Sequence, residues 1–191
     1  MVRVTRRGAL AAGAAAAGGV AIGRRGGGAS PAAAAGRTDT EILNLFLVLE
    51  QVQAGFYRAA LQAGRLDGEL KDAATALAGQ EDAHVALLKR KLGDRAGGPP
   101  PMDFKSASGS PESFRADAIA LEEAAIAAYI GQAANLSRPL VAPIATLVSV
   151  EARQVAWLRD LAGISPAPHA QDAPQSAQAV LADLRKRGLL T

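Results

Sequence analysis

The sequence predicts an all-α protein, a four-helix bundle followed by a short C-terminal helix. From residue 38 onward, apolar residues recur at helical spacing, and no stretch alternates with the period of two that is typical of a β-strand. Glycine and proline separate the helical stretches from one another. The first two predicted helices also resemble the next two in the spacing of their polar residues. Together these observations predict a helix pair that is used twice.

The first 36 residues are predicted to be a signal segment that is disordered in the folded protein. They contain the twin arginines Arg6 and Arg7, a weakly hydrophobic run over 8–23 and a small-residue cleavage site at 33–35. The run is too short and too rich in glycine for a transmembrane helix, which needs about 20 apolar residues. The pattern resembles a bacterial Tat signal, although small residues follow the arginines where bulky ones are usual. We therefore expect export through the Tat pathway to a periplasmic, extracytoplasmic or secreted location, with transient membrane contact; an Ala/Gly-rich tail is the alternative.

Composition excludes several classes of function. The chain has 21 basic and 18 acidic residues, and five of the basic residues lie in the signal segment, which contains no acid. The remaining 16 basic and 18 acidic residues give the rest of the chain a net charge of −2. This charge and the scarcity of aromatic residues argue against nucleic-acid binding. The absence of cysteine excludes disulfides, thiolate metal sites and thiol catalysis.

The first helix is predicted to begin at a capping box. Thr38 and Glu41 have the required spacing, in which each side chain bonds the backbone N–H of the other residue. This helix is expected to run to about Gly64. The second helix is expected over 68–92 and to stop at Gly93, because glycine tolerates the left-handed conformation that commonly follows a helix.

Three further helices are predicted in the second half of the chain. Ser110 and Pro111 open the third helix, with proline at the first helical position, where its missing N–H costs least. A proline-rich segment precedes the amphipathic C-terminal helix. The third helix is expected to end between 131 and 135, the fourth to run from between 138 and 143 to Gly163, and the last to cover about 176–187. The expected regions are a signal segment (1–36), a bundle (37–164) and a C-terminal segment (165–191).

Each bundle helix carries one glutamate in the middle of its apolar stripe. Glu50 and Glu81 are 31 residues apart, and Glu122 and Glu151 are 29 residues apart. The first glutamate of each pair is followed by a tyrosine after seven residues, so the repeat predicts approximate two-fold symmetry. The inward positions are Leu43, Leu47, Glu50, Ala54 and Tyr57; Leu70, Ala74, Leu77, Glu81, His84, Leu88 and Leu92; Ala118, Glu122, Ala125 and Tyr129; and Ile144, Leu147, Glu151, Val155 and Leu158.

Four carboxylates directed at one bundle axis predict a metal site. A lone buried carboxylate is costly unless it is protonated, paired or metal-bound, and Arg58 and Arg153 lie off the apolar stripes. Two divalent cations would neutralise four such acids. Carboxylate and imidazole without thiolate suit iron, manganese or zinc. Glu81 and His84 form a Glu-x-x-His motif, whose members share a helix face and which occurs in di-iron and di-manganese carboxylate bundles.

Four stretches resemble the exported ferritin-like domain family, which also contains plant desiccation-related proteins. They are TDTEILNLFLVLEQVQAGFY (38–57), QEDAHVALL (80–88), ALEEAAIAAY (120–129) and VEARQVAWLRDL (150–161). The resemblance covers about 38–163 and implies a ferritin-like bundle. It also implies metal ligands at Glu50, Glu81, His84, Glu122 and Glu151. Gln154 stands where a second histidine is expected, so both one and two metal ions remain open.

The residues around these positions have plainer interpretations as well. Tyr57 and Tyr129 are either hydrogen-bond donors to the ligands, redox-active groups or core residues with a satisfied hydroxyl. Glu123 and Asp82 are expected at the surface, because each lies about 100° around its helix from an inward glutamate. The second histidine, His169, is expected in a loop.

Two hypotheses of function follow. In the first, the exported domain binds one or two iron or manganese ions in a carboxylate-bridged site and oxidises the metal or reduces O₂ or peroxide. In the second, Gln154 marks a metal-free bundle that acts as a stress-protective or binding scaffold. The sequence leaves the metal, the substrate, the catalytic residues, enzymatic activity and homo-oligomer formation undetermined.

Overall fold

The computed structural model describes residues 38–104 and 109–191, and the predicted signal segment lies outside these residues. Within them the protein is all-helical, as predicted, apart from an isolated β-bridge between Met102 and Leu190. No helix in this part of the chain is long and apolar enough to cross a membrane. The α-helices are α1 (Asp39–Ala63), α2 (Gly68–Leu92), α3 (Pro111–Gln132), α4 (Arg138–Leu161) and α5 (Ala177–Lys186), with short 3-10 turns η1 (Gly93–Arg95) and η3 (Ala133–Asn135).

The predicted capping box of α1 is confirmed. The Glu41 N–H donates to the Thr38 hydroxyl at 3.3 Å, and the Thr38 N–H donates to the Glu41 carboxylate at 2.7 Å. At the other end, Gly64 adopts the left-handed conformation, with φ 67° and ψ 23°. Gly93 ends α2 with a positive φ of 58°, but its ψ of −134° differs from the expected left-handed geometry. Gly93 is also the first residue of η1, so α2 is followed directly by a 3-10 turn and does not end in the expected left-handed cap.

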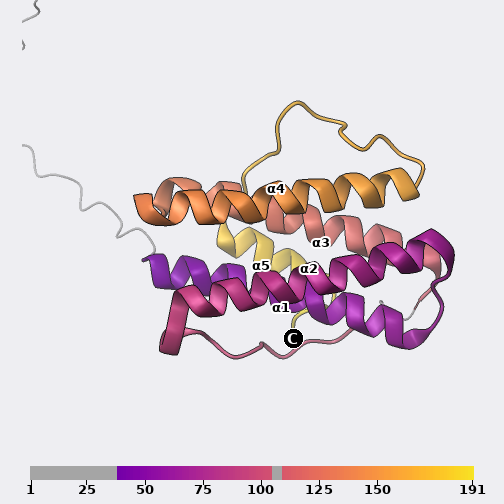
Figure 1. Ribbon diagram of the computed structural model, residues 1–191, viewed down its shortest axis with the longest axis horizontal. Coiled ribbons are helices and arrows are strands. Elements are labelled where there is room, and N and C mark those ends of the chain that lie inside the picture. The colour runs from indigo at the N-terminus through magenta and orange to yellow at the C-terminus, as the bar shows by residue number, and fades with distance from the viewer. Residues whose placement is uncertain (1–37, 105–108) are drawn as a thin grey trace, which may run out of the picture. The chain divides into compact units, whose positions relative to one another are not determined.

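The four long helices lie side by side, and α5 packs against α3 (Figure 1). Contacts join α1 to α2 and α3, and join α4 to α2 and α3. The long connection between α2 and α3 is tied to the C-terminus, because the Thr191 N–H donates to the Pro101 carbonyl at 3.3 Å. Every inward position predicted from the apolar stripes is buried.

Two apolar clusters fill the bundle, one on each side of a polar layer. The first, the Phe114 cluster, includes Phe56, Leu77, Phe114 and Leu158. The second, the Phe46 cluster, includes Ile42, Phe46, Leu88 and Leu147. Helix α5 spans both, because Ala177 belongs to the Phe46 cluster and Val180 and Leu184 to the Phe114 cluster. The polar layer consists of Glu50, Gln53, Glu81, His84, Glu122, Glu151 and Gln154, all buried.

Candidate metal centre

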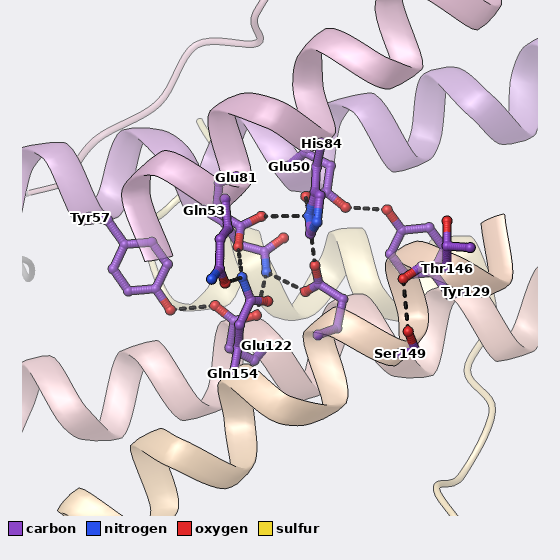
Figure 2. Close-up of polar contacts among 12 residues, drawn as sticks. Glu50, Gln53, Tyr57, Glu81, His84, Glu122, Tyr129, Thr146, Ser149 and Gln154 are labelled. Carbon is purple, nitrogen blue, oxygen red and sulfur yellow. Dashed lines mark hydrogen bonds and ion pairs between the residues drawn. The ribbon is translucent and has the colours of Figure 1, made fainter. Parts of the chain in front are cut away.

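Each long helix contributes one glutamate to the polar layer, and Figure 2 labels Glu50, Glu81 and Glu122 among them. The helical period of 3.6 residues places each glutamate between apolar residues of the same stripe, so packing of the two clusters forces its carboxylate inward. All four glutamates are 0% exposed, and His84 is 6% exposed. The site is therefore closed to bulk water by the same packing that builds the bundle.

Three carboxylate oxygens converge on the Nδ1 atom of His84. This nitrogen lies 3.0 Å from Glu151 Oε1, 3.1 Å from Glu50 Oε2 and 3.3 Å from Glu81 Oε2. One ligand atom from each of these four residues lies within 4.8 Å of the other three. Ligand atoms about 2.1 Å from a shared cation are separated by about 3.0 Å along octahedral edges and about 3.4 Å along tetrahedral edges. The three distances from His84 Nδ1 fall within this range, so these four residues could hold one first-row metal ion.

The remaining carboxylate oxygens of the layer accept hydrogen bonds from neutral donors. The phenol of Tyr129 donates to Glu50 Oε1, and the phenol of Tyr57 donates to Glu122 Oε1. The Gln53 amide donates to Glu122 Oε2 at 2.9 Å and to Glu151 Oε2 at 3.0 Å. The Gln154 amide donates to Glu81 Oε1 at 2.6 Å and to Gln80 Oε1 at 3.0 Å. The carboxylates are thus held in fixed orientations.

Burial and mutual repulsion perturb the acids of the layer. Burial raises the pKa of Glu81 to about 8; the hydrogen bond with His84 opposes this rise, and the charge of Glu50 adds to it. Burial also raises the pKa of Glu122 well above its usual range, and the charges of Glu151 and Glu81 raise it further. Four ionised carboxylates cannot share this space without a compensating cation.

The surrounding carboxylates favour the charged form of His84. Burial alone would lower the pKa of His84, but hydrogen bonds with Glu151, Glu50 and Glu81 raise it to about 12. Burial, reinforced by the charges of Glu122 and Glu50 respectively, raises the pKa values of Tyr57 and Tyr129, so both phenols remain donors. In the metal-free protein, a protonated His84 is therefore the cation at the centre of the acids.

Two of the converging oxygens support the fit to a metal ion. Glu81 Oε2 and Glu151 Oε1 are buried, and within the described residues they have no hydrogen-bonding neighbour other than His84 Nδ1. A buried carboxylate oxygen with a single polar neighbour keeps a lone pair for a metal ion. Oxygen ligands from carboxylates together with one imidazole nitrogen are the donor set that suits iron, manganese or zinc.

The structure brings together four of the five residues predicted as metal ligands. Glu50, Glu81, His84 and Glu151 form the converging group. Glu122 lies in the same layer, but it is outside this group, and both of its oxygens accept hydrogen bonds from Tyr57 and Gln53. The roles of all five as ligands remain predictions.

The neighbouring residues mostly lie where the sequence placed them. Glu123 and Asp82 are exposed and pair with Arg159 and Arg58 respectively. His169 is exposed in the segment between α4 and α5. Both tyrosines are buried and each phenol donates to a glutamate, which agrees with a donor to a ligand and with a core residue whose hydroxyl is satisfied.

Sequence reasoning missed Gln53. Its amide bridges two glutamates from two other helices, α3 and α4. The sequence contained a pattern that predicts this position. Gln53 follows Glu50 by three residues, the same spacing that separates Gln154 from Glu151. Glutamine at i+3 therefore occurs on two of the four helices, and histidine on one.

A family model described as a ferritin-like domain matches residues 38–163. This range contains the whole of α1 to α4 and every residue of the polar layer. No curated protein matches the chain significantly.

Proposed function

The chain belongs to the ferritin-like domain family, and from this membership and the polar layer we propose that it binds iron or manganese. The proposed ligands are Glu50, Glu81, His84 and Glu151. The convergence of three buried carboxylate oxygens on one imidazole nitrogen, at 3.0–3.3 Å, carries the proposal. A cation at this point would add a partner to the Glu81 and Glu151 oxygens, whose one polar neighbour is His84 Nδ1, and would offset the repulsion among the acids.

We propose O₂ or peroxide as the reaction partner. Bound iron or manganese supplies redox chemistry with these oxidants, and the simplest reaction is oxidation of the ion itself. The chain's own contribution is to hold the ligands and exclude water. The Phe114 and Phe46 clusters close the layer on both sides, and Tyr129 and Gln154 orient the carboxylates of Glu50 and Glu81.

The test is metal content per chain, compared between two matched variants of α2. Glu81→Gln removes a proposed ligand, whereas Asp82→Asn makes the same chemical change at the adjacent exposed position. We expect near-stoichiometric iron or manganese in the wild type and in Asp82→Asn, and a large loss in Glu81→Gln. Chelation should lower the melting temperature of the first two proteins, because a ligand at 100 times its Kd stabilises the native state by about 2.7 kcal/mol.

The alternative is a metal-free scaffold, and one observation favours it. A protonated His84 already pairs with three carboxylates, so the layer has a cation of its own. Such a protein would contain no metal and would keep its melting temperature on chelation. That result in the wild type, purified after export from a metal-replete host, would contradict metal binding.

We also propose export through the Tat pathway, on the basis of the twin arginines of the N-terminal segment. The paired change Arg6→Lys with Arg7→Lys should retain the protein in the cytoplasm of a Tat-competent bacterium, because the pathway recognises the arginine pair. Fractionation followed by immunoblotting measures this. Equal export of the paired variant and the wild type would contradict the proposed route.

A further inference from the structure

We propose that this centre holds one metal ion and not two, because the amides of Gln53 and Gln154 replace the second ion that the two-fold pattern of the bundle would accommodate. The inference rests on the proposed function and narrows it to a mononuclear site. It follows from the partners of the eight carboxylate oxygens that the four glutamates contribute.

Three of these oxygens face His84 Nδ1, one each from Glu50, Glu81 and Glu151. The other five already accept a hydrogen bond from a neutral side chain (Figure 2). One cation position therefore has around it an imidazole nitrogen and three oxygens whose one polar neighbour is that nitrogen. The rest of the layer has neither.

A second cation position lacks a ligand at Gln154, the residue that corresponds to His84 in the repeat. Gln154 follows Glu151 as His84 follows Glu81, but its amide nitrogen donates to Glu81 Oε1 at 2.6 Å. An amide N–H donor does not coordinate a cation. Its hydrogen bond also occupies the Glu81 oxygen that a second ion would need.

Gln53 occupies carboxylate oxygens of Glu122 and Glu151 that do not face His84. Its amide nitrogen donates to Glu122 Oε2 at 2.9 Å and to Glu151 Oε2 at 3.0 Å, so it bridges the two carboxylates as a cation would. Tyr57 takes the other oxygen of Glu122. Glu122 thereby becomes a hydrogen-bonded structural acid, and the metal keeps only the three other glutamates.

The alternative arrangement has both amides rotated, so that their oxygens face a second cation. Gln53 Oε1 and Gln154 Oε1 are buried and make no hydrogen bond. Turning both amides by half a turn would direct these oxygens at the carboxylates, and such contacts between acceptors are repulsive unless a second cation lies between them. Metal stoichiometry therefore distinguishes the two arrangements.

The experiment titrates the purified metal-free full chain with Mn²⁺ and records bound ions per chain and the electron paramagnetic resonance spectrum. We expect one ion per chain and the hyperfine pattern of an isolated Mn²⁺ ion. The double variant Gln53→Ala with Gln154→His frees the occupied oxygens and supplies a second imidazole. It should bind two ions and give an exchange-coupled spectrum.

Gln51→Ala is the matched control. Gln51 is a buried glutamine of α1, as Gln53 is, but it makes no hydrogen bond to the four glutamates. It should bind one ion, as the wild type does. Two coupled ions in the wild type would overturn this inference and leave the proposed function intact. A double variant that folds and binds only one ion would also overturn it.

Absence of any ion in the wild type would overturn the proposed function, and this inference with it. If the double variant does not fold, the wild-type stoichiometry and spectrum still decide between one ion and two.

Discussion

The hydroxyl of Tyr129 on α3 donates a hydrogen bond to the carboxylate of Glu50 on α1. The reciprocal bond runs from Tyr57 on α1 to Glu122 on α3. Each tyrosine therefore serves the glutamate of the other helix and not the one seven residues before it in its own. Because Glu50 converges on His84 and Glu122 does not, these equivalent bonds should have different consequences for metal binding.

Replacing Tyr129 by phenylalanine should weaken metal binding about 10–100-fold, because loss of a hydrogen bond to a ligand has effects of this size. Tyr57→Phe is the matched comparison. It should lower the free energy of unfolding of the metal-free protein by about 1–3 kcal/mol, because the buried Glu122 Oε1 would lose its hydrogen-bond donor. It should change Mn²⁺ affinity much less. Competition titrations with a chelator measure the affinities. Equal weakening in the two variants would count against the exclusion of Glu122 from the ligand set.

Glu122→Gln should retain the metal, whereas Glu151→Gln should lose it. The two glutamates are equally buried, but only Glu151 presents an oxygen to His84 Nδ1. The exposed neighbour Glu123, changed to glutamine, provides the control for loss of a carboxylate on α3. Elemental analysis of the three variants decides the matter, and metal loss in Glu122→Gln would show that this acid is a ligand.

Phe114→Ala should lower the free energy of unfolding by about 3–5 kcal/mol, as expected for an aromatic residue removed from a packed core. Its ring is fully buried and stacks on that of Phe56, with centroids 5.5 Å apart and planes inclined by 9°. Ile164→Ala, at a position that is 47% exposed, should change the same quantity by less than about 0.5 kcal/mol. Denaturant titrations compare the two, and similar values for both would contradict the assigned core.

Gly131→Ala should destabilise the protein by about 1–3 kcal/mol, as overpacking commonly does. A Cβ atom at this position of α3 would lie 2.0 Å from the Gln175 carbonyl oxygen, in the segment that leads to α5. The Gln175 N–H donates to the Ala127 carbonyl at 3.0 Å, so the clash would also strain this anchor. Faster amide exchange in the segment from 165 to 176 should accompany the loss of stability.

Gly79→Ala on α2 is the control for this substitution. A Cβ atom there would meet nothing within 4 Å. Since alanine is favoured over glycine inside a helix, the change should stabilise the protein by about 0.5–1 kcal/mol. The two glycine variants should therefore shift the unfolding midpoint in opposite directions, and a shift in the same direction would refute the close approach at Gly131.

The sequence by itself determined the helices and the inward direction of the acids. Apolar residues at helical spacing assign one face of each helix to the core, and a glutamate on that face is carried inward with them. Local chemistry also set most boundaries, such as the capping box at Thr38 and proline at the start of α3. The i, i+3 spacing of Glu81 and His84 likewise placed both on one face.

Only the tertiary structure decided which of these groups meet. Periodicity fixes the direction of a side chain around its own helix, but the rotation and axial register between helices depend on how the two apolar clusters pack. That register pairs Tyr129 with Glu50, brings Gln53 to Glu122 and Glu151, and leaves Glu122 outside the group around His84. The donors that occupy each carboxylate oxygen lie on other helices, so their assignment required the packed bundle.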